Sequence, residues 1–230
     1  MGLIHDNPVR DSIGKLAEAL FNRKTSGAPF VILTAYIDES GTHGPSPLSV
    51  MAGYVADPRQ WRNYEKRTAK LFRRYRVDVF HAIDVKRGDG CFKGWPVDRK
   101  LSFMDEFGAI NNDLEFGFVS ILKTADYDAF YAKKQRPKKV IQDPKYGVLF
   151  RAIVAGMVEV IAQLRKWPPN LQLHFVLEQG HPNGPDAVRL YQWSCSKMSE
   201  RARQALGPIT FESVPLRKGQ RAGLRLPPRA

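Results

Sequence analysis

The sequence predicts an α/β protein, with a mixed central sheet flanked by helices. Short apolar runs of strand length are bounded by turn residues, and longer segments carry apolar residues at helical spacing. Predicted strands come first along the chain, and helices are interleaved with strands afterwards. We therefore expect a single domain over residues 1–230, with an N-terminal helix and linker over 1–28 and an irregular basic tail over 214–230.

Six segments are predicted as strands. FVILTAYI, residues 30–37, is apolar on both faces, which is typical of a strand in the middle of a sheet. LQLHFVLE, residues 171–178, has the same character and places His174 within the sheet. The other predicted strands cover residues 48–55, 77–81, 114–122 and 209–213.

Helices are predicted where apolar residues recur every three or four positions. The clearest begins at Asp57-Pro58, an N-cap followed by a proline in the first turn, and carries its apolar residues on one face. That face comprises Trp61, Tyr64, Thr68, Phe72 and Tyr75. The predicted helices cover residues 12–24, 58–76, 96–112, 125–134, 143–167 and 186–205.

Composition restricts the class of protein. The 230 residues carry a net charge of +13, which favours a polyanionic partner such as nucleic acid. No apolar run has the length of a membrane span and the N-terminus lacks a signal-peptide core, so we expect a cytoplasmic protein with no membrane partner. Cys91 and Cys195 form no pattern typical of disulfides or of a zinc site.

A basic stripe runs along the predicted helix 58–76, opposite its apolar face. It consists of Arg59, Arg62, Lys66, Lys70 and Arg73, which recur at helical spacing. Such a stripe would suit contacts with nucleic-acid phosphates, which position a partner without reading its sequence. The alternative is a face that water alone solvates.

Carboxylates follow two of the apolar strands. Asp38 and Glu39 come after the strand 30–37, and Glu178 ends the strand 171–178. If these strands are neighbours, Asp38 and Glu178 meet at one end of the sheet, whereas Glu39 points to the opposite face unless a bulge turns it. Clustered carboxylates are relieved by Mg²⁺ or Mn²⁺, and two such ions support phosphodiester cleavage. The alternative is that these strands simply end at water. His81, after the predicted strand 77–81, is expected to reach the same sheet end.

Three segments carry a resemblance to a known family. AYIDESGT, VFHAIDVKRG and HFVLEQGHPNG, in this order, resemble the bacterial domain-of-unknown-function family 3800, over roughly residues 30–213. The resemblance implies a ribonuclease H-like fold, which is associated with metal-dependent nucleases and transposases. It also implies a metal site at Asp38 and Glu178, with Glu39 as a further participant and His81 nearby.

The C-terminal segment departs from the family pattern. Members usually end in a Leu-Gln-x-x-Asp segment whose Asp completes the acidic set, whereas ITFES is followed here by VPLRKGQRAGLRLPPRA, which has no acid. A shift of reading frame is one hypothesis for this difference, and the nucleotide sequence of the gene would test it. On this hypothesis the chain lacks one metal ligand and its activity is impaired.

The sequence thus predicts a Mg²⁺- or Mn²⁺-dependent nuclease, with Asp38 and Glu178 as metal ligands. Asp38, Glu39, Glu178 and His81 are the candidate catalytic residues, and the basic stripe is the candidate contact for DNA or RNA. One alternative is a nucleic-acid-binding module without catalysis, or a partner of another enzyme. Another is a basic structural domain with no polyanionic partner.

Overall fold

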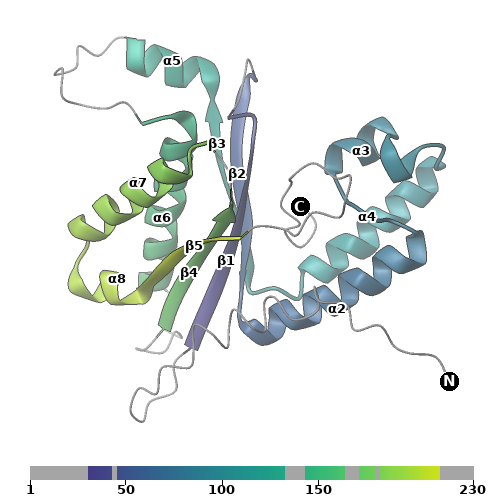
Figure 1. Cartoon of the computed structure of the whole chain (residues 1–230), viewed down its shortest axis with the longest axis horizontal. Coiled ribbons are helices and arrows are strands. Elements are labelled where there is room, and N and C mark those ends of the chain that lie inside the picture. Colours follow the sequence, from purple (N-terminus) through teal and green to yellow (C-terminus); the bar gives the residue numbers. More distant parts are fainter. Residues whose placement is uncertain (1–30, 43–45, 133–142, 164–170, 180–181, 213–230) are drawn as a thin grey trace.

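A five-stranded mixed sheet forms the centre of the protein (Figure 1). The computed structural model describes residues 31–42, 46–132, 143–163, 171–179 and 182–212. The strands are β1 (Val31–Ser40), β2 (Leu48–Ala56), β3 (Phe116–Lys123), β4 (Leu171–Glu178) and β5 (Leu206–Glu212). Their order is β3-β2-β1-β4-β5. The β1–β2 and β2–β3 pairs are antiparallel, and the β1–β4 and β4–β5 pairs are parallel.

Helices cover both faces of the sheet, which Figure 1 shows nearly edge-on. One layer contains α2 (Pro58–Tyr75), α3 (Ala82–Arg87) and α4 (Val97–Asn111), with a short 3₁₀ turn at Gly90–Phe92. The other contains α5 (Thr124–Ala132), α6 (Lys145–Gln163), α7 (Gly184–Lys197) and α8 (Glu200–Ala205). The predicted α/β class, with a mixed sheet flanked by helices, is therefore confirmed.

The first core lies between the sheet and the layer that contains α6 and α7. Its buried side chains come from alternate positions of the strands, so that one strand face points toward these helices. They include Leu33, Ala35 and Ile37 of β1, Met51 and Val55 of β2, Leu173, Phe175 and Leu177 of β4, Tyr146, Leu149, Phe150, Ile153 and Met157 of α6, and Tyr191 of α7.

The second core lies on the other face of the sheet and is rich in aromatic side chains. It includes Tyr36, Trp61, Tyr64, Phe80, Phe92, Phe103 and Phe107. Trp61 is almost fully buried, and its indole N–H donates to the Thr34 carbonyl oxygen at 3.0 Å. This hydrogen bond joins α2 to β1.

The start of α2 agrees with the predicted cap. Asp57 accepts a hydrogen bond from the Gln60 backbone N–H, and the Gln60 side chain accepts one from the Asp57 backbone. This reciprocal pair satisfies two N–H groups that the first turn leaves without helical partners. The helix ends at Arg76, whose left-handed conformation (φ 58°) turns the chain away.

The predicted strand over 77–81 is wrong. Val77 and Phe80 are buried in the second core, but the segment that joins α2 to α3 is irregular. The Val77 N–H donates to the Phe72 carbonyl oxygen at 2.9 Å and completes the end of α2 instead of joining a strand. The apolar residues here anchor a turn, which short apolar runs do not distinguish from a strand.

The predicted helix over 186–205 is divided in two. Met198 adopts an extended conformation after α7, and the Ser199 hydroxyl accepts a hydrogen bond from the Ala202 N–H as the N-cap of α8. Ser199 therefore marks a second helix start that the apolar spacing concealed. The predicted helix over 12–24, the end of the helix 143–167 and the tail 214–230 lie outside the described residues.

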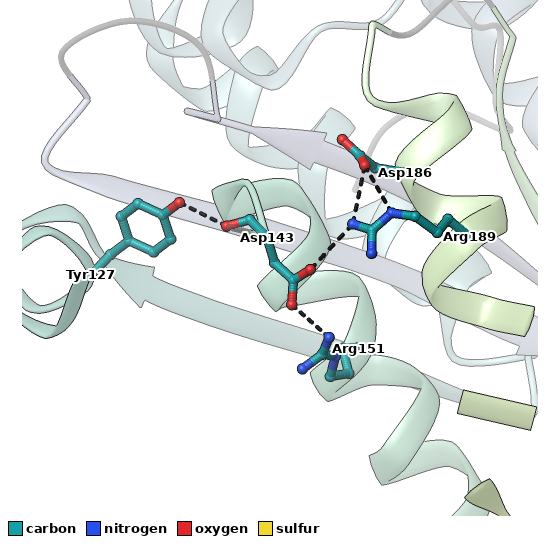
Figure 2. A network of polar contacts seen from close by, with 5 residues as sticks. All are labelled: Tyr127, Asp143, Arg151, Asp186 and Arg189. Atoms are coloured by element: carbon teal, nitrogen blue, oxygen red, sulfur yellow. Dashed lines mark hydrogen bonds and ion pairs between the residues drawn. The ribbon is translucent and has the colours of Figure 1, made fainter. Parts of the chain in front are cut away.

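An ion-pair network fastens α6 to α7 (Figure 2). The Asp143 carboxylate, just before α6, pairs with Arg151 at 2.5 Å and with Arg189 of α7 at 3.2 Å. Arg189 also pairs with Asp186 at 3.1 Å, and the Tyr127 hydroxyl donates to the Asp143 carbonyl oxygen. Asp143 is 9% exposed, so the two guanidinium groups offset the cost of burying its charge. None of the described helices has the length and apolar character required to cross a membrane.

Candidate functional site

Asp38 and Glu178 line one pocket at the carboxyl ends of adjacent strands. The parallel register of β1 and β4 runs from Val31–Leu171 to Tyr36–Val176, and two further residues along it are Asp38 and Glu178. The pocket is lined by Ile37, Asp38, Glu39, Met51, Tyr146 and Glu178. The structure therefore brings together the two residues that were predicted as metal ligands.

Glu39 also lines this pocket. β1 does not end before the acids, as the apolar run indicated, because pairing with β2 continues to Ser40–Val50. The register has no bulge between Asp38 and Ser40, so Asp38 and Glu39 alternate across the strand. The Glu39 carboxylate accepts a hydrogen bond from the Thr42 hydroxyl at 2.5 Å, which fixes its position beside the pocket.

Besides the three acids, the pocket lining contains one polar side chain, Tyr146 of α6. It is 3% exposed. Burial raises the pKa of its hydroxyl, and the nearby charges of Glu39, Glu178 and Asp38 raise that pKa further. All three candidate carboxylates therefore act on one hydroxyl group, which stays protonated at neutral pH. No motif in the sequence distinguished Tyr146 from the other core residues of its helix.

Glu212, a residue that the sequence analysis missed, continues the acidic set. It ends β5 and lies opposite Glu178 in the β4–β5 register. Burial raises its pKa. The sequence pattern could have indicated Glu212, because ITFE is another apolar strand that ends on a carboxylate.

Glu65 of α2 and Tyr36 of β1 surround Glu212. Burial, together with the charge of Glu212, raises the pKa of Glu65 to about 7. Burial also raises the pKa of Tyr36, as do the charges of Glu212 and Glu65. The helical spacing places Glu65 one turn after Trp61, at the border of the apolar face of α2, and no motif marked it.

The fit of a divalent cation depends on the number of oxygen ligands. Among the described residues, no group of three or more His, Cys, Asp and Glu side chains is arranged to hold a metal ion. Mg²⁺, however, commonly takes only one or two carboxylates and completes its coordination with water and substrate phosphate. The pair Asp38 and Glu178 has the donor chemistry for this kind of site.

His81 stands apart from the pocket. It is the N-cap of α3, and its backbone carbonyl oxygen accepts from the N–H groups of Asp84 and Val85. The pocket-lining residues do not include it. His81 thus follows a turn and begins a helix, and does not end a strand as the sequence predicted.

The basic stripe is fully on the surface of α2. All five of its side chains are exposed, and none forms an ion pair with a described residue. By contrast, Arg67 pairs with Asp113, and Arg74 with Glu106. Trp61 and Tyr64 point toward the second core, so the stripe points away from the sheet. The structure therefore does not bring the stripe together with the carboxylates.

Comparison of the sequence with protein-family models and with curated proteins finds no match.

Proposed function

We propose that this protein is a Mg²⁺- or Mn²⁺-dependent nuclease of ribonuclease H-like fold, related to the domain-of-unknown-function family 3800. Asp38 and Glu178 would hold the metal, with Glu39 beside them and nucleic acid as the substrate. The observation that carries the proposal is the shared pocket of Asp38 and Glu178 at the carboxyl ends of two adjacent parallel strands. Open sheets place their ligands at such strand ends.

The residues of the pocket suit the chemistry of phosphodiester cleavage. A divalent cation bound there would supply positive charge to the scissile phosphate and to the attacking water. Asp38 and Glu178 would offer oxygen ligands, and Glu212 lies next to Glu178 as a further carboxylate. The protonated Tyr146 hydroxyl would act as a hydrogen-bond donor within the pocket. No role for His81 follows from its position.

The test is cleavage of labelled single-stranded, double-stranded and hybrid oligonucleotides in Mg²⁺ and in Mn²⁺. Wild type is compared with Asp38→Asn, Glu178→Gln and Glu212→Gln. Asp128→Asn is the matched control, since Asp128 is exposed on α5, away from the pocket lining. Loss of a direct ligand is expected to lower the rate at least about 100-fold, because even residues that only orient ligands cost 10–100-fold. Equal rates for wild type and Asp38→Asn would exclude this site.

The second candidate function is nucleic-acid binding without catalysis. The observation that favours it is the basic stripe, whose five exposed cations have no described acidic partner and face away from the pocket. This function predicts binding that is unchanged by Asp38→Asn and abolished when the stripe is neutralised. Measuring nucleic-acid binding of these variants thus separates the two functions even when no substrate is cleaved.

A further inference from the structure

Strand β3 forms one edge of the sheet, and β2 is its only neighbour among the strands that the structure describes. The Thr124 N–H donates to the Pro47 carbonyl oxygen at 3.0 Å and continues the β2–β3 ladder. Alternate residues of an antiparallel strand direct both backbone groups to the same side. The even-numbered residues of β3 therefore pair with β2. The backbone groups of Gly117, Val119, Ile121 and Lys123 point to the open edge.

The side chains of these odd-numbered residues are exposed as well. Phe116, Phe118 and Leu122 pack against the first core, so the intervening residues lie on the other face of the sheet. Val119 is 62% exposed and Ile121 is 61% exposed. This edge strand thus presents, side by side, apolar side chains and backbone groups that pair with no other described strand.

The two edges of the sheet differ in their protection. β5, the opposite edge, contains Pro208, and its register with β4 shifts between Leu173 and Phe175. Proline and irregular pairing are devices that prevent a further strand from adding to an edge. β3 has no proline, its register with β2 is regular, and no charged residue lies within it before Lys123 at its end.

We propose that β3 pairs antiparallel with β3 of a second copy of this chain, across a two-fold axis at Val119. This register joins the outward-facing backbone groups of the two copies. It also brings Glu115 of each copy near Lys123 of the other, just outside the paired segment, because the Glu115 N–H donates to the Val55 carbonyl oxygen and so faces β2. A Glu–Lys pair thus lies on each side of the axis. The charges at the two ends of the strand are therefore self-complementary.

Gly117 is compatible with the same register. A side chain at this position would meet the Tyr54 ring, since a Cβ there would lie 2.9 Å from Tyr54 Cε1. In the proposed pairing, Ile121 of the second copy lies opposite Gly117 and covers the side of this ring. A two-fold axis at Ser120 would instead set Lys123 opposite Gly117, and would leave Glu115 without that cation.

The interface is small, so the dimer is expected to be reversible. A single strand pair buries less than the ~1,200–2,000 Å² of a standard stable interface. The full chain should therefore change from monomer to dimer as its concentration rises, as measured by sedimentation equilibrium. Ile121→Lys and Val119→Lys are expected to remain monomeric at concentrations where wild type is dimeric. Leu101→Lys is the matched control, because Leu101 is an exposed apolar residue of α4.

Charge-exchange variants and cysteine variants test the proposed register. Glu115→Lys and Lys123→Glu should each weaken the dimer, and the double exchange should restore it. With Cys91 and Cys195 replaced by Ser, Val119→Cys should form an intermolecular disulfide on oxidation. The Cα atoms of a hydrogen-bonded pair lie ~5.5 Å apart, within the range of a disulfide. Ile121→Cys should not form this disulfide, because Ile121 lies opposite Gly117 of the second copy, four residues away from the second Ile121.

Three results would overturn the proposal. The first is a wild-type monomer at the highest soluble concentration. The second is a dimer that Leu101→Lys dissociates but Ile121→Lys does not, which would place the interface on α4. The third is a disulfide in Ile121→Cys but not in Val119→Cys. None of these measurements depends on nuclease activity.

Discussion

Glu178 and Glu212 lie opposite each other on the parallel strands β4 and β5. Glu178 is also the neighbour of Asp38 on β1, so three adjacent strands each carry an acid at the same end of the sheet. Glu65 of α2 lies near the last of these acids: burial, together with the charge of Glu212, raises the pKa of Glu65.

The first prediction concerns Glu65→Gln. Burial, together with the charge of Glu212, raises the pKa of Glu65 from 4.5 to about 7 in the folded protein. Between these two values the folded state binds more protons than the unfolded state, so the free energy of unfolding falls as the pH rises. Gln removes this fall. The variant should melt near wild type at pH 4.5 and above it at pH 8.

Thermal melting of both proteins across this pH range measures the effect. Asp105→Asn is the control, since Asp105 is exposed on α4 and should not change the difference between the two pH values. A difference between wild type and Glu65→Gln that does not depend on pH would contradict the assignment of the titration to Glu65.

The second prediction concerns metal binding at Asp38 and Glu178. A cation that binds only the folded state stabilises it, by about 2.7 kcal/mol at a concentration 100 times its Kd. Mg²⁺ or Mn²⁺ should therefore raise the Tm of wild type, and the rise should be absent in Asp38→Asn and Glu178→Gln. Metal-free buffer and the Asp128→Asn variant serve as controls. An equal rise in all of these proteins would show that the cation binds elsewhere.

The third prediction concerns the basic stripe. Replacing Arg62, Lys66 and Lys70 by Ala should weaken nucleic-acid binding. It should also flatten the plot of log affinity against log salt, by roughly 0.7–0.9 for each phosphate that the protein no longer neutralises. Fluorescence anisotropy over a range of salt concentrations measures both quantities.

The control for this experiment changes the net charge equally. It replaces Lys93, Lys197 and Arg203, exposed cations outside the stripe, by Ala. If affinity and slope fall equally in both triple variants, the attraction depends on net charge and the stripe has no special role.

The fourth prediction concerns Asp143. Asp143→Asn removes the charge that two guanidinium groups share between α6 and α7 (Figure 2). Hydrogen bonds to charged groups are worth about 1.5–3 kcal/mol, so the free energy of unfolding should fall by about that amount. Asp186→Asn breaks only an exposed pair with Arg189 and should cost under about 1 kcal/mol. Urea unfolding of the two variants compares them, and equal decreases would contradict the difference in burial.

Much of the fold could be predicted because its elements are strongly patterned. β4 has the predicted bounds, and α2 begins at the predicted cap, since apolar runs and the Asp-Pro start are local signals. The prediction of a strand over 77–81 failed because the burial of Val77 and Phe80 depends on α4 and the sheet, not on a strand partner. The break at Met198 was not predicted for a related reason, since the apolar spacing continues across it.

The sequence by itself determined the net charge, the basic stripe, and the three acids that were predicted after or at the end of apolar strands. Only the tertiary structure decided which of them meet. Strand order made β1 a neighbour of β4 and β4 a neighbour of β5, and this brought Asp38 to Glu178 and added Glu212. Helix packing pointed the stripe away from that pocket and left His81 outside its lining. The physical reason is that strand pairing and core packing join residues far apart in the chain, and no local pattern specifies those partners.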